Sequence, residues 1–246
     1  MGYDEFVRQL APLEYFEPGA FRPDRGMRKE VCNFVLALAW VHGEIMDLFL
    51  AHKLLSEVRP HEQDKDTPRW GHWGGMVLHL LRIQAAVIHE FLYLIQKNKG
   101  VLDDPGFHEV LDSVSHTARK HWQAIVSVAI GRPSRTPLAK ALVIIRNKVG
   151  FHYDAEKIGL AYQAFVAKSS ADPPVLSRGP TLGASRFYFA DAAADYFLLS
   201  TDETKEAKKA LLDPKLMEGV AAVLFCIVTQ FVEMRGSPWK VGKSQV

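Results

Sequence analysis

The chain has 246 residues, of which 48% are hydrophobic and 24% charged, and its formal net charge is +2. This composition excludes a disordered tail, and the length allows a sizeable core that needs neither disulfides nor metals. So small a net charge gives no support to non-specific polyanion binding, which usually requires a dense basic stripe. The densest basic cluster is either a solvated helix face or a phosphate contact; it comprises Arg132, Arg135, Lys140, Arg146 and Lys148.

The two cysteines and the lengths of the apolar runs bear on the cellular compartment in which the protein resides. Cys32 and Cys226 lie in apolar helical runs, and we expect both to be buried and reduced. The N-terminal stretch lacks the long apolar region of a secretory signal. The longest apolar run, 220–232, is shorter than the roughly 20 residues that cross a bilayer. The sequence therefore predicts a cytoplasmic protein with no membrane partner.

The first half of the chain predicts two long helices. Residues 1–26 contain several prolines and predict an irregular arm with one short helix. From 27 to 57, apolar residues recur at spacings of three and four, which predicts a helix. A polar loop should follow. The glycine- and tryptophan-rich stretch 70–75 is expected to be a flexible aromatic loop that leads into a second long helix at 76–97.

The middle of the chain predicts three further helices. A third helix should run from 105 to 130 and a fourth from 134 to 149. Gly150 fits the position just after a helix end, where glycine is favoured. Asp154 fits the N-cap of a fifth helix at 155–168.

The last third begins with a long loop at 169–186 that is rich in Pro, Gly and Ser. A short element around 187–199 is expected to be helical, although alternation at its start also fits a β-strand. A final helical region reaches 234 and should split at Asp213-Pro214. Strands and helices do not alternate, so we predict an all-α fold: an up-and-down helical bundle that forms one domain over 27–246.

An arginine and a histidine flank the end of the fourth expected helix. Arg146 and Asn147 close its apolar stretch, and His152 follows Gly150. Histidine titrates near neutrality and can move the proton of an RNA 2′-hydroxyl, while arginine can stabilise phosphate charge. On one continuous helix Arg146 and His152 would lie about 120° apart. A helix that ends at Gly150 frees His152 to turn towards Arg146.

This segment resembles the motif of the HEPN superfamily. In that family an arginine, usually followed by a polar residue, precedes a histidine with four to six positions between them; here Arg146-Asn147 to His152 has five. The resemblance implies an all-helical bundle, usually a homodimer with a composite site at its interface. It also implies metal-independent endoribonuclease activity, often in toxin–antitoxin or phage-defence systems, although some members only bind or scaffold. Members silenced by tyrosine modification carry that tyrosine two places after the histidine, where this chain has Asp154.

The candidate roles follow from the residue types. We expect His152 to act as general acid and base, Arg146 to stabilise phosphate charge and Asn147 to orient them. Candidate substrate contacts are Lys148, Arg135 and Tyr153. In the competing interpretation, Arg146 and Asn147 cap a helix C-terminus and His152 is a partly buried, hydrogen-bonded side chain.

Other motifs are weaker. Arg82 and His89, with six positions between them, also fall within the family's range of spacings, but in mid-helix and with Ile83 in the polar position. The ten histidines form neither a His-Glu-x-x-His motif nor paired Glu-x-x-His motifs, so no metal is expected. The chain has no P-loop motif, and we expect no cofactor. RNA, a second copy of the chain and an unidentified antitoxin are the expected partners.

Overall fold

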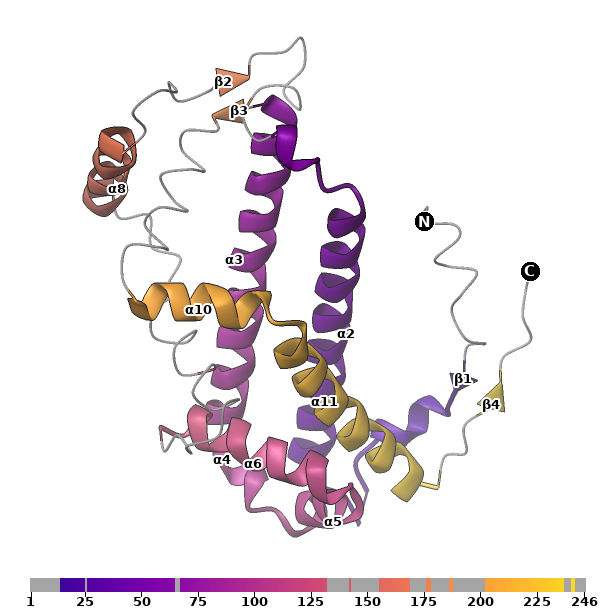
Figure 1. Ribbon diagram of the computed structural model, residues 1–246. Helices are drawn as coiled ribbons and strands as arrows, with labels where there is room; N and C mark the ends of the chain where they lie inside the picture. The colour runs from indigo at the N-terminus through magenta and orange to yellow at the C-terminus, as the bar shows by residue number, and fades with distance from the viewer. Residues whose placement is uncertain are drawn as a thin grey trace. The chain divides into compact units, whose positions relative to one another are not determined.

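The fold is all-α, as predicted. The computed structural model describes residues 14–24, 26–64, 67–131, 142, 155–168, 176–177, 186–187, 202–236 and 240–241. Its helices are α2 (Lys29–Glu57), α3 (Pro68–Lys97), α4 (Lys99–Leu102), α5 (Pro105–Ser113), α6 (His116–Ala129), α8 (Ala155–Lys168), α10 (Asp202–Leu212) and α11 (Pro214–Met234). Among them, α2 and α3 are the long helices that dominate Figure 1.

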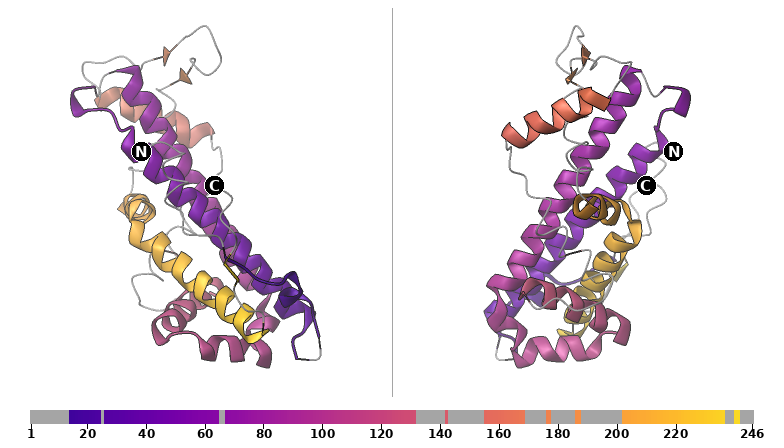
Figure 2. Two further views of the ribbon diagram at one scale, coloured as in Figure 1. Left: turned by 90° about the vertical axis from the view of Figure 1, so that its right-hand side faces the viewer. Right: turned by 60° about the vertical axis from the view of Figure 1, so that its left-hand side comes forward.

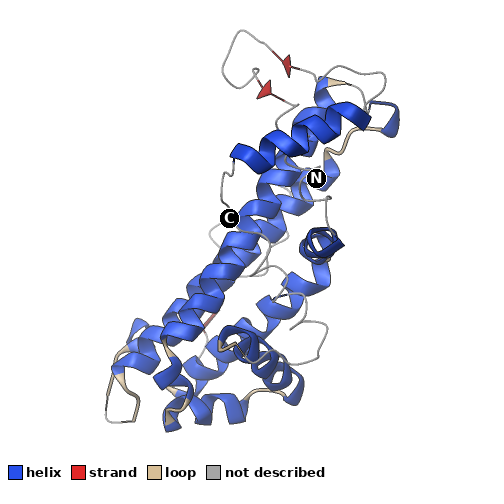
Figure 3. Ribbon diagram, turned by 90° about the vertical axis from the view of Figure 1, so that its left-hand side faces the viewer, coloured by secondary structure: helices blue, strands red, loops and turns tan. Residues whose placement is uncertain are grey.

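The described strands are short antiparallel pairs that do not change the fold class. β1 (Glu14–Tyr15) pairs with β4 (Lys240–Val241), and β2 (Leu176–Ser177) pairs with β3 (Arg186–Phe187). β2 and β3 are the two small red arrows at the top of Figure 3, where helices make up most of the coloured ribbon. Phe187 therefore lies in a strand and not in the expected helix.

Several predicted boundaries are confirmed. The fifth expected helix coincides with α8 at Ala155–Lys168. The last helical region splits at Asp213 into α10 and α11, which both views of Figure 2 draw as separate helices. Gly131 ends the α6 region with φ of 77°, a left-handed conformation that glycine adopts without steric cost.

Two predicted boundaries are wrong. The stretch 70–75 is not a loop, because α3 already begins at Pro68. Thr67 precedes that proline and its hydroxyl accepts a hydrogen bond from the Trp70 N–H at 3.4 Å, as expected for a helix start. The expected helix 105–130 is instead α5 and α6. Ser115 starts α6, and its hydroxyl accepts from the Ala118 N–H at 3.2 Å.

The chain forms two compact units. Unit 1 comprises Met1–Asp47, Glu90–Ala139 and Met217–Val246, and unit 2 comprises Leu48–His89 and Lys140–Leu216. Helices α2, α3 and α11 each contribute residues to both units.

Unit 1 has an aromatic core. The rings of Phe34, Phe107 and Trp122 meet edge to face, with centroid distances of 5.5, 5.8 and 6.3 Å. All three side chains are at most 2% exposed. Edge-to-face contacts add to the stabilisation that burial of such large rings already gives. This cluster therefore joins α2, α5 and α6 within the unit.

Arg235 fastens the N-terminal segment of unit 1 to the end of α11. Its guanidinium donates hydrogen bonds to the carbonyl oxygens of Ala20 and Arg22 and forms an ion pair with Asp24 at 2.7 Å. The other carboxylate oxygen of Asp24 accepts from the N–H groups of Gly26 and Met27. The pKa of Asp24 is therefore lowered, chiefly by the hydrogen bond from Arg235.

Unit 2 contains a buried polar link. Gln84 on α3 is 1% exposed, and its amide nitrogen donates to the carbonyl oxygen of Leu211 on α10 at 2.8 Å. Its amide oxygen lies 3.0 Å from Nε2 of His52 on α2. One amide thus joins three helices, and burial of its polar atoms is tolerated because both ends are hydrogen-bonded.

The predicted cytoplasmic location is wrong. Within the described residues, three helices are long and apolar enough to cross a membrane: Lys29–Glu57, Pro68–Lys97 and Lys215–Met234. The sequence argument counted only uninterrupted apolar runs. A helix satisfies its own backbone hydrogen bonds and tolerates occasional polar side chains, so its whole length matters. These helices point to a membrane-associated protein.

Candidate functional site

The residues of the arginine–histidine motif lie outside the described part of the chain. This applies to all six predicted site residues: Arg135, Arg146, Asn147, Lys148, His152 and Tyr153. The described residues around them give three reference points. Leu142 is helical and fully buried, α6 ends at Ala129, and α8 begins at Ala155, three residues after His152.

The second arginine–histidine spacing lies in an unbroken helix. Arg82 and His89 both belong to α3, which continues to Lys97. Seven helical residues correspond to a rise of about 10.5 Å, so the two backbones are nearly two turns apart. No helix end brings this histidine back towards its arginine, which makes the pair a useful control for the motif at Arg146.

The tryptophans of α3 have structural partners. Trp73 Nε1 donates to the carbonyl oxygen of Leu55 on α2 at 3.0 Å. The Arg59 guanidinium lies 5.9 Å from the ring centroid of Trp70 and 5.5 Å from that of Trp73, within the range of cation–π attraction. These rings therefore secure the connection between α2 and α3, as expected of packing residues, and are not an open platform for stacking bases.

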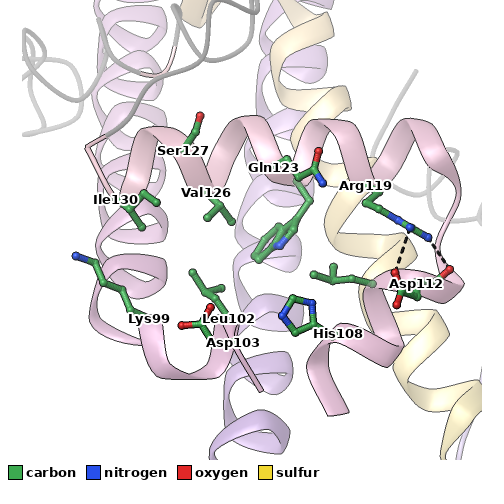
Figure 4. A pocket seen from close by; sticks show the side chains of 12 residues that line it. Lys99, Leu102, Asp103, His108, Asp112, Arg119, Gln123, Val126, Ser127 and Ile130 are labelled. Atoms are coloured by element: carbon green, nitrogen blue, oxygen red, sulfur yellow. Dashed lines mark hydrogen bonds and ion pairs between the residues drawn. The ribbon is translucent and has the colours of Figure 1, made fainter. Parts of the chain in front are cut away.

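A cavity of about 640 Å³ lies among α4, α5 and α6 of unit 1. Figure 4 shows its wall of apolar side chains, including Leu102, Val126 and Ile130. Its polar lining includes Lys99 and His108, which come from α4 and α5. A pocket of this size with a mixed lining has the dimensions of a small-molecule site.

Arg119 at one side of this cavity is held by its neighbour. Its guanidinium forms an ion pair with the Asp112 carboxylate at 3.1 Å and donates to the Asp112 carbonyl oxygen at 2.6 Å. Its buried Nε has no hydrogen-bond partner within the part of the chain that the structure describes. The formal charges of Lys99 and Arg119 are balanced by those of Asp103 and Asp112, so the lining has no excess of acid-independent positive charge to stabilise a transferring phosphate.

Sequence reasoning did not identify the cavity. Its lining residues are separated by up to 31 positions, from Lys99 to Ile130, and they meet only because α5 and α6 are two helices. A prediction of one straight helix over 105–130 places them along a rod. The serine at 115, a favoured N-cap residue, was the signal for that break.

Metal and thiol chemistry receive no support from the described residues. Among them, no group of three His, Cys, Asp or Glu side chains is arranged to hold a metal ion. Both cysteines are free thiols; Cys32 is buried, whereas Cys226 is only partly so. The expected burial is thus confirmed for Cys32 and not for Cys226.

No protein-family model, no curated protein and no solved structure matches this chain. Its function is therefore inferred from its own residues.

Proposed function

We propose that this all-α protein is a HEPN-like endoribonuclease that needs no metal. The observation that carries the proposal is the sequence motif Arg146-Asn147 to His152. His152 removes the proton of a ribose 2′-hydroxyl, whose oxygen attacks the adjacent phosphorus. The bond to the 5′-oxygen breaks, and that oxygen leaves with a proton that the protonated His152 donates. The products carry a 2′,3′-cyclic phosphate and a 5′-hydroxyl.

The other motif residues stabilise and orient this reaction. Arg146 donates hydrogen bonds to the phosphate oxygens as negative charge develops, and Asn147 orients the reacting groups. Lys148, Arg135 and Tyr153 contact the RNA. Two copies of the chain form a homodimer and share one cleft, because a two-fold axis brings two copies of each residue together. In a toxin or phage-defence setting, an antitoxin would hold this activity in check.

Two described features support the proposal. The chain is all-α, which is the class that the HEPN resemblance implies. In addition, α8 begins at Ala155, so a helix start lies directly after the motif, where Asp154 was expected to act as N-cap. The fifth helix that the sequence predicted after the motif is therefore present.

RNA cleavage in the presence of EDTA tests the proposal. We expect the native protein to cut mixed RNA, and His152→Ala and Arg146→Ala each to lose at least about 100-fold in rate, the usual contribution of a general acid–base group. His89→Ala is the matched control, because it removes a histidine from the same kind of spacing in the unbroken α3 helix. Equal cleavage by the native protein and His152→Ala would show that the activity comes from elsewhere.

The shared cleft has its own test. Mixed dimers of Arg146→Ala and His152→Ala subunits contain one intact arginine and one intact histidine. If the cleft is composite, mixing the two inactive variants should restore part of the activity. A sum of the two separate activities would instead favour a site within one subunit.

A second candidate function is a non-catalytic helical interaction module. It is favoured by large apolar side chains on the surface of unit 1: Trp40 is 74% exposed, Phe225 58% and Leu36 52%. Exposed aromatic residues of this size are typical of association surfaces. This alternative predicts that the protein binds RNA or dimerises without cleaving RNA. Mutation of His152 should then change neither RNA binding nor dimerisation.

A further inference from the structure

The charged residues that line the cavity among α4, α5 and α6 differ in whether they already have partners. Arg119 and Asp112 form an ion pair at 3.1 Å. Lys99 on α4 and Asp103, which ends that helix, have no hydrogen-bond or ion-pair partner for their side chains within the part of the chain that the structure describes. Figure 4 shows these two side chains at one side of the cavity and the Arg119–Asp112 pair at the other. One ammonium group and one carboxylate are therefore available to a ligand.

The rest of the lining is largely apolar. On α6 the apolar lining residues are Trp122, Val126 and Ile130, and their spacing of four places them on one face of the helix. Leu102 of α4 and Leu111 of α5 also line the cavity. Such a lining favours a hydrocarbon or aromatic group, because burial of apolar area stabilises the complex, whereas buried hydroxyl groups would lose hydrogen bonds to water.

The walls of the cavity are held in place by contacts within the protein. Trp122 is 2% exposed and packs edge to face against Phe34 and Phe107. The Arg119 guanidinium joins α6 to α5 through the carboxylate and the carbonyl oxygen of Asp112. Because these contacts already fix the walls, a ligand need not order them when it binds.

The balance of charge narrows the class of ligand. Lys99 and Arg119 are matched by Asp103 and Asp112, so a ligand with several charges of one sign gains no net attraction. A ligand with one carboxylate and one ammonium group can instead pair with Lys99 and Asp103 at the same time. These two residues are four positions apart, about one helical turn, and both can reach the same end of a small molecule.

We propose that this cavity binds the zwitterion of an α-amino acid with a large apolar side chain. The carboxylate of the ligand lies at Lys99 and its ammonium group at Asp103. Its side chain extends between Leu102 and Val126 towards Trp122. Binding requires neither the motif at Arg146 nor RNA cleavage, so either proposal can fail without the other.

Isothermal titration calorimetry of the full chain with phenylalanine and its derivatives tests the proposal. N-acetylphenylalanine lacks the ammonium group and phenylalaninamide lacks the carboxylate, so each should bind at least about 10-fold more weakly than phenylalanine. From alanine through 2-aminobutyrate and norvaline to norleucine, affinity should rise by about fourfold for each added methylene. No binding of phenylalanine, or equal binding of phenylalanine and its two derivatives, would overturn the proposal.

Variants at the two unpaired charges assign each group of the ligand. Lys99→Met should weaken phenylalanine by at least about 10-fold and leave phenylalaninamide unchanged, because only the acid uses the cation. Asp103→Asn should weaken phenylalanine to a similar extent and leave N-acetylphenylalanine unchanged. The matched controls are Lys120→Met on α6 and Glu109→Gln on α5, since both residues are exposed and neither lines the cavity.

A third variant tests the apolar part of the site. Val126→Trp fills the cavity from α6 and should weaken phenylalanine by at least about 10-fold. Folding of every variant is checked by helical circular dichroism and the thermal unfolding midpoint. Should Val126→Trp fail to fold, the variants at Lys99 and Asp103 still decide the question, because both residues are exposed. Unchanged phenylalanine binding in those two variants would show that the amino acid is bound elsewhere.

Discussion

The interiors of the two units are stabilised by different kinds of interaction. In unit 1, Phe34, Phe107 and Trp122 fill the core with rings and use no polar atom to do so. In unit 2, a buried amide, Gln84, connects three helices, and α3 also lines a cavity in this unit. In a core of closely packed rings, the removal of one side chain leaves a cavity and therefore lowers stability. A hydrogen-bonded amide instead fixes which residues face one another, because its donor and acceptor must both find partners.

The largest expected effect comes from breaking the ring cluster. Trp122→Ala should lower the free energy of unfolding by about 3–5 kcal/mol, the usual cost of removing a large buried aromatic side chain. Chemical denaturation of the purified protein measures this loss. Trp40→Ala is the matched control, because Trp40 is 74% exposed and should change stability by no more than about 0.5 kcal/mol. Similar losses in the two variants would contradict the description of the core.

A smaller effect is expected from the buried amide of unit 2. Gln84→Leu keeps the volume roughly constant and removes both hydrogen bonds, which leaves the Leu211 carbonyl oxygen and the His52 ring without this partner. We expect a loss of about 1–3 kcal/mol in the free energy of unfolding. The same substitution at Gln123, an exposed residue of α6, is the control. A stabilised Gln84→Leu protein would mean that the amide serves specificity at the expense of stability.

Local sequence signals predicted much of the fold, and the part that they missed depends on a tertiary contact. Apolar periodicity located α2, and the local signals at Asp154 and Asp213-Pro214 located α8 and the split between α10 and α11. Local reasoning failed at 70–75, where glycines suggested a loop. There Trp73 bonds to Leu55, 18 positions away, and this tertiary contact outweighs the local preference of glycine.

The candidate sites also differ in whether the sequence alone reveals them. The arginine–histidine motif is local in sequence, so it was visible from the chain alone, whereas its geometry falls outside the described residues. The cavity among α4, α5 and α6 is the reverse case. Lys99 and Ile130 are 31 positions apart, and neither belongs to a motif that predicts a small-molecule site. Such a cavity becomes visible only after the helices are packed together.

The smallest expected effect concerns the ion pair between Asp24 and Arg235 in unit 1, whose contribution to stability depends on pH, whereas that of the ring cluster does not. The folded-state pKa of Asp24 is lowered by the Arg235 hydrogen bond, and the unfolded value for aspartate is about 3.9. A lowered folded-state pKa means that the unfolded chain takes up the proton first as the pH falls. The stabilisation is therefore complete above the unfolded pKa and is lost as the pH falls through the folded one.

Asp24→Asn tests this sign, because it keeps the shape of the side chain and removes its charge. The native protein should unfold at a higher temperature than the variant at pH 7, and the gap between the two should close as the pH falls below about 4. The difference should be small, because Asp24 is exposed and its ion pair is screened by solvent. A gap that persists unchanged to a pH of about 2 would mean that the substitution disturbs the hydrogen bonds to the N–H groups of Gly26 and Met27, and that the charge of Asp24 contributes nothing. Trp122→Ala, by contrast, should lower the unfolding temperature by the same amount at pH 7 and at a pH of about 2, because ring packing involves no proton.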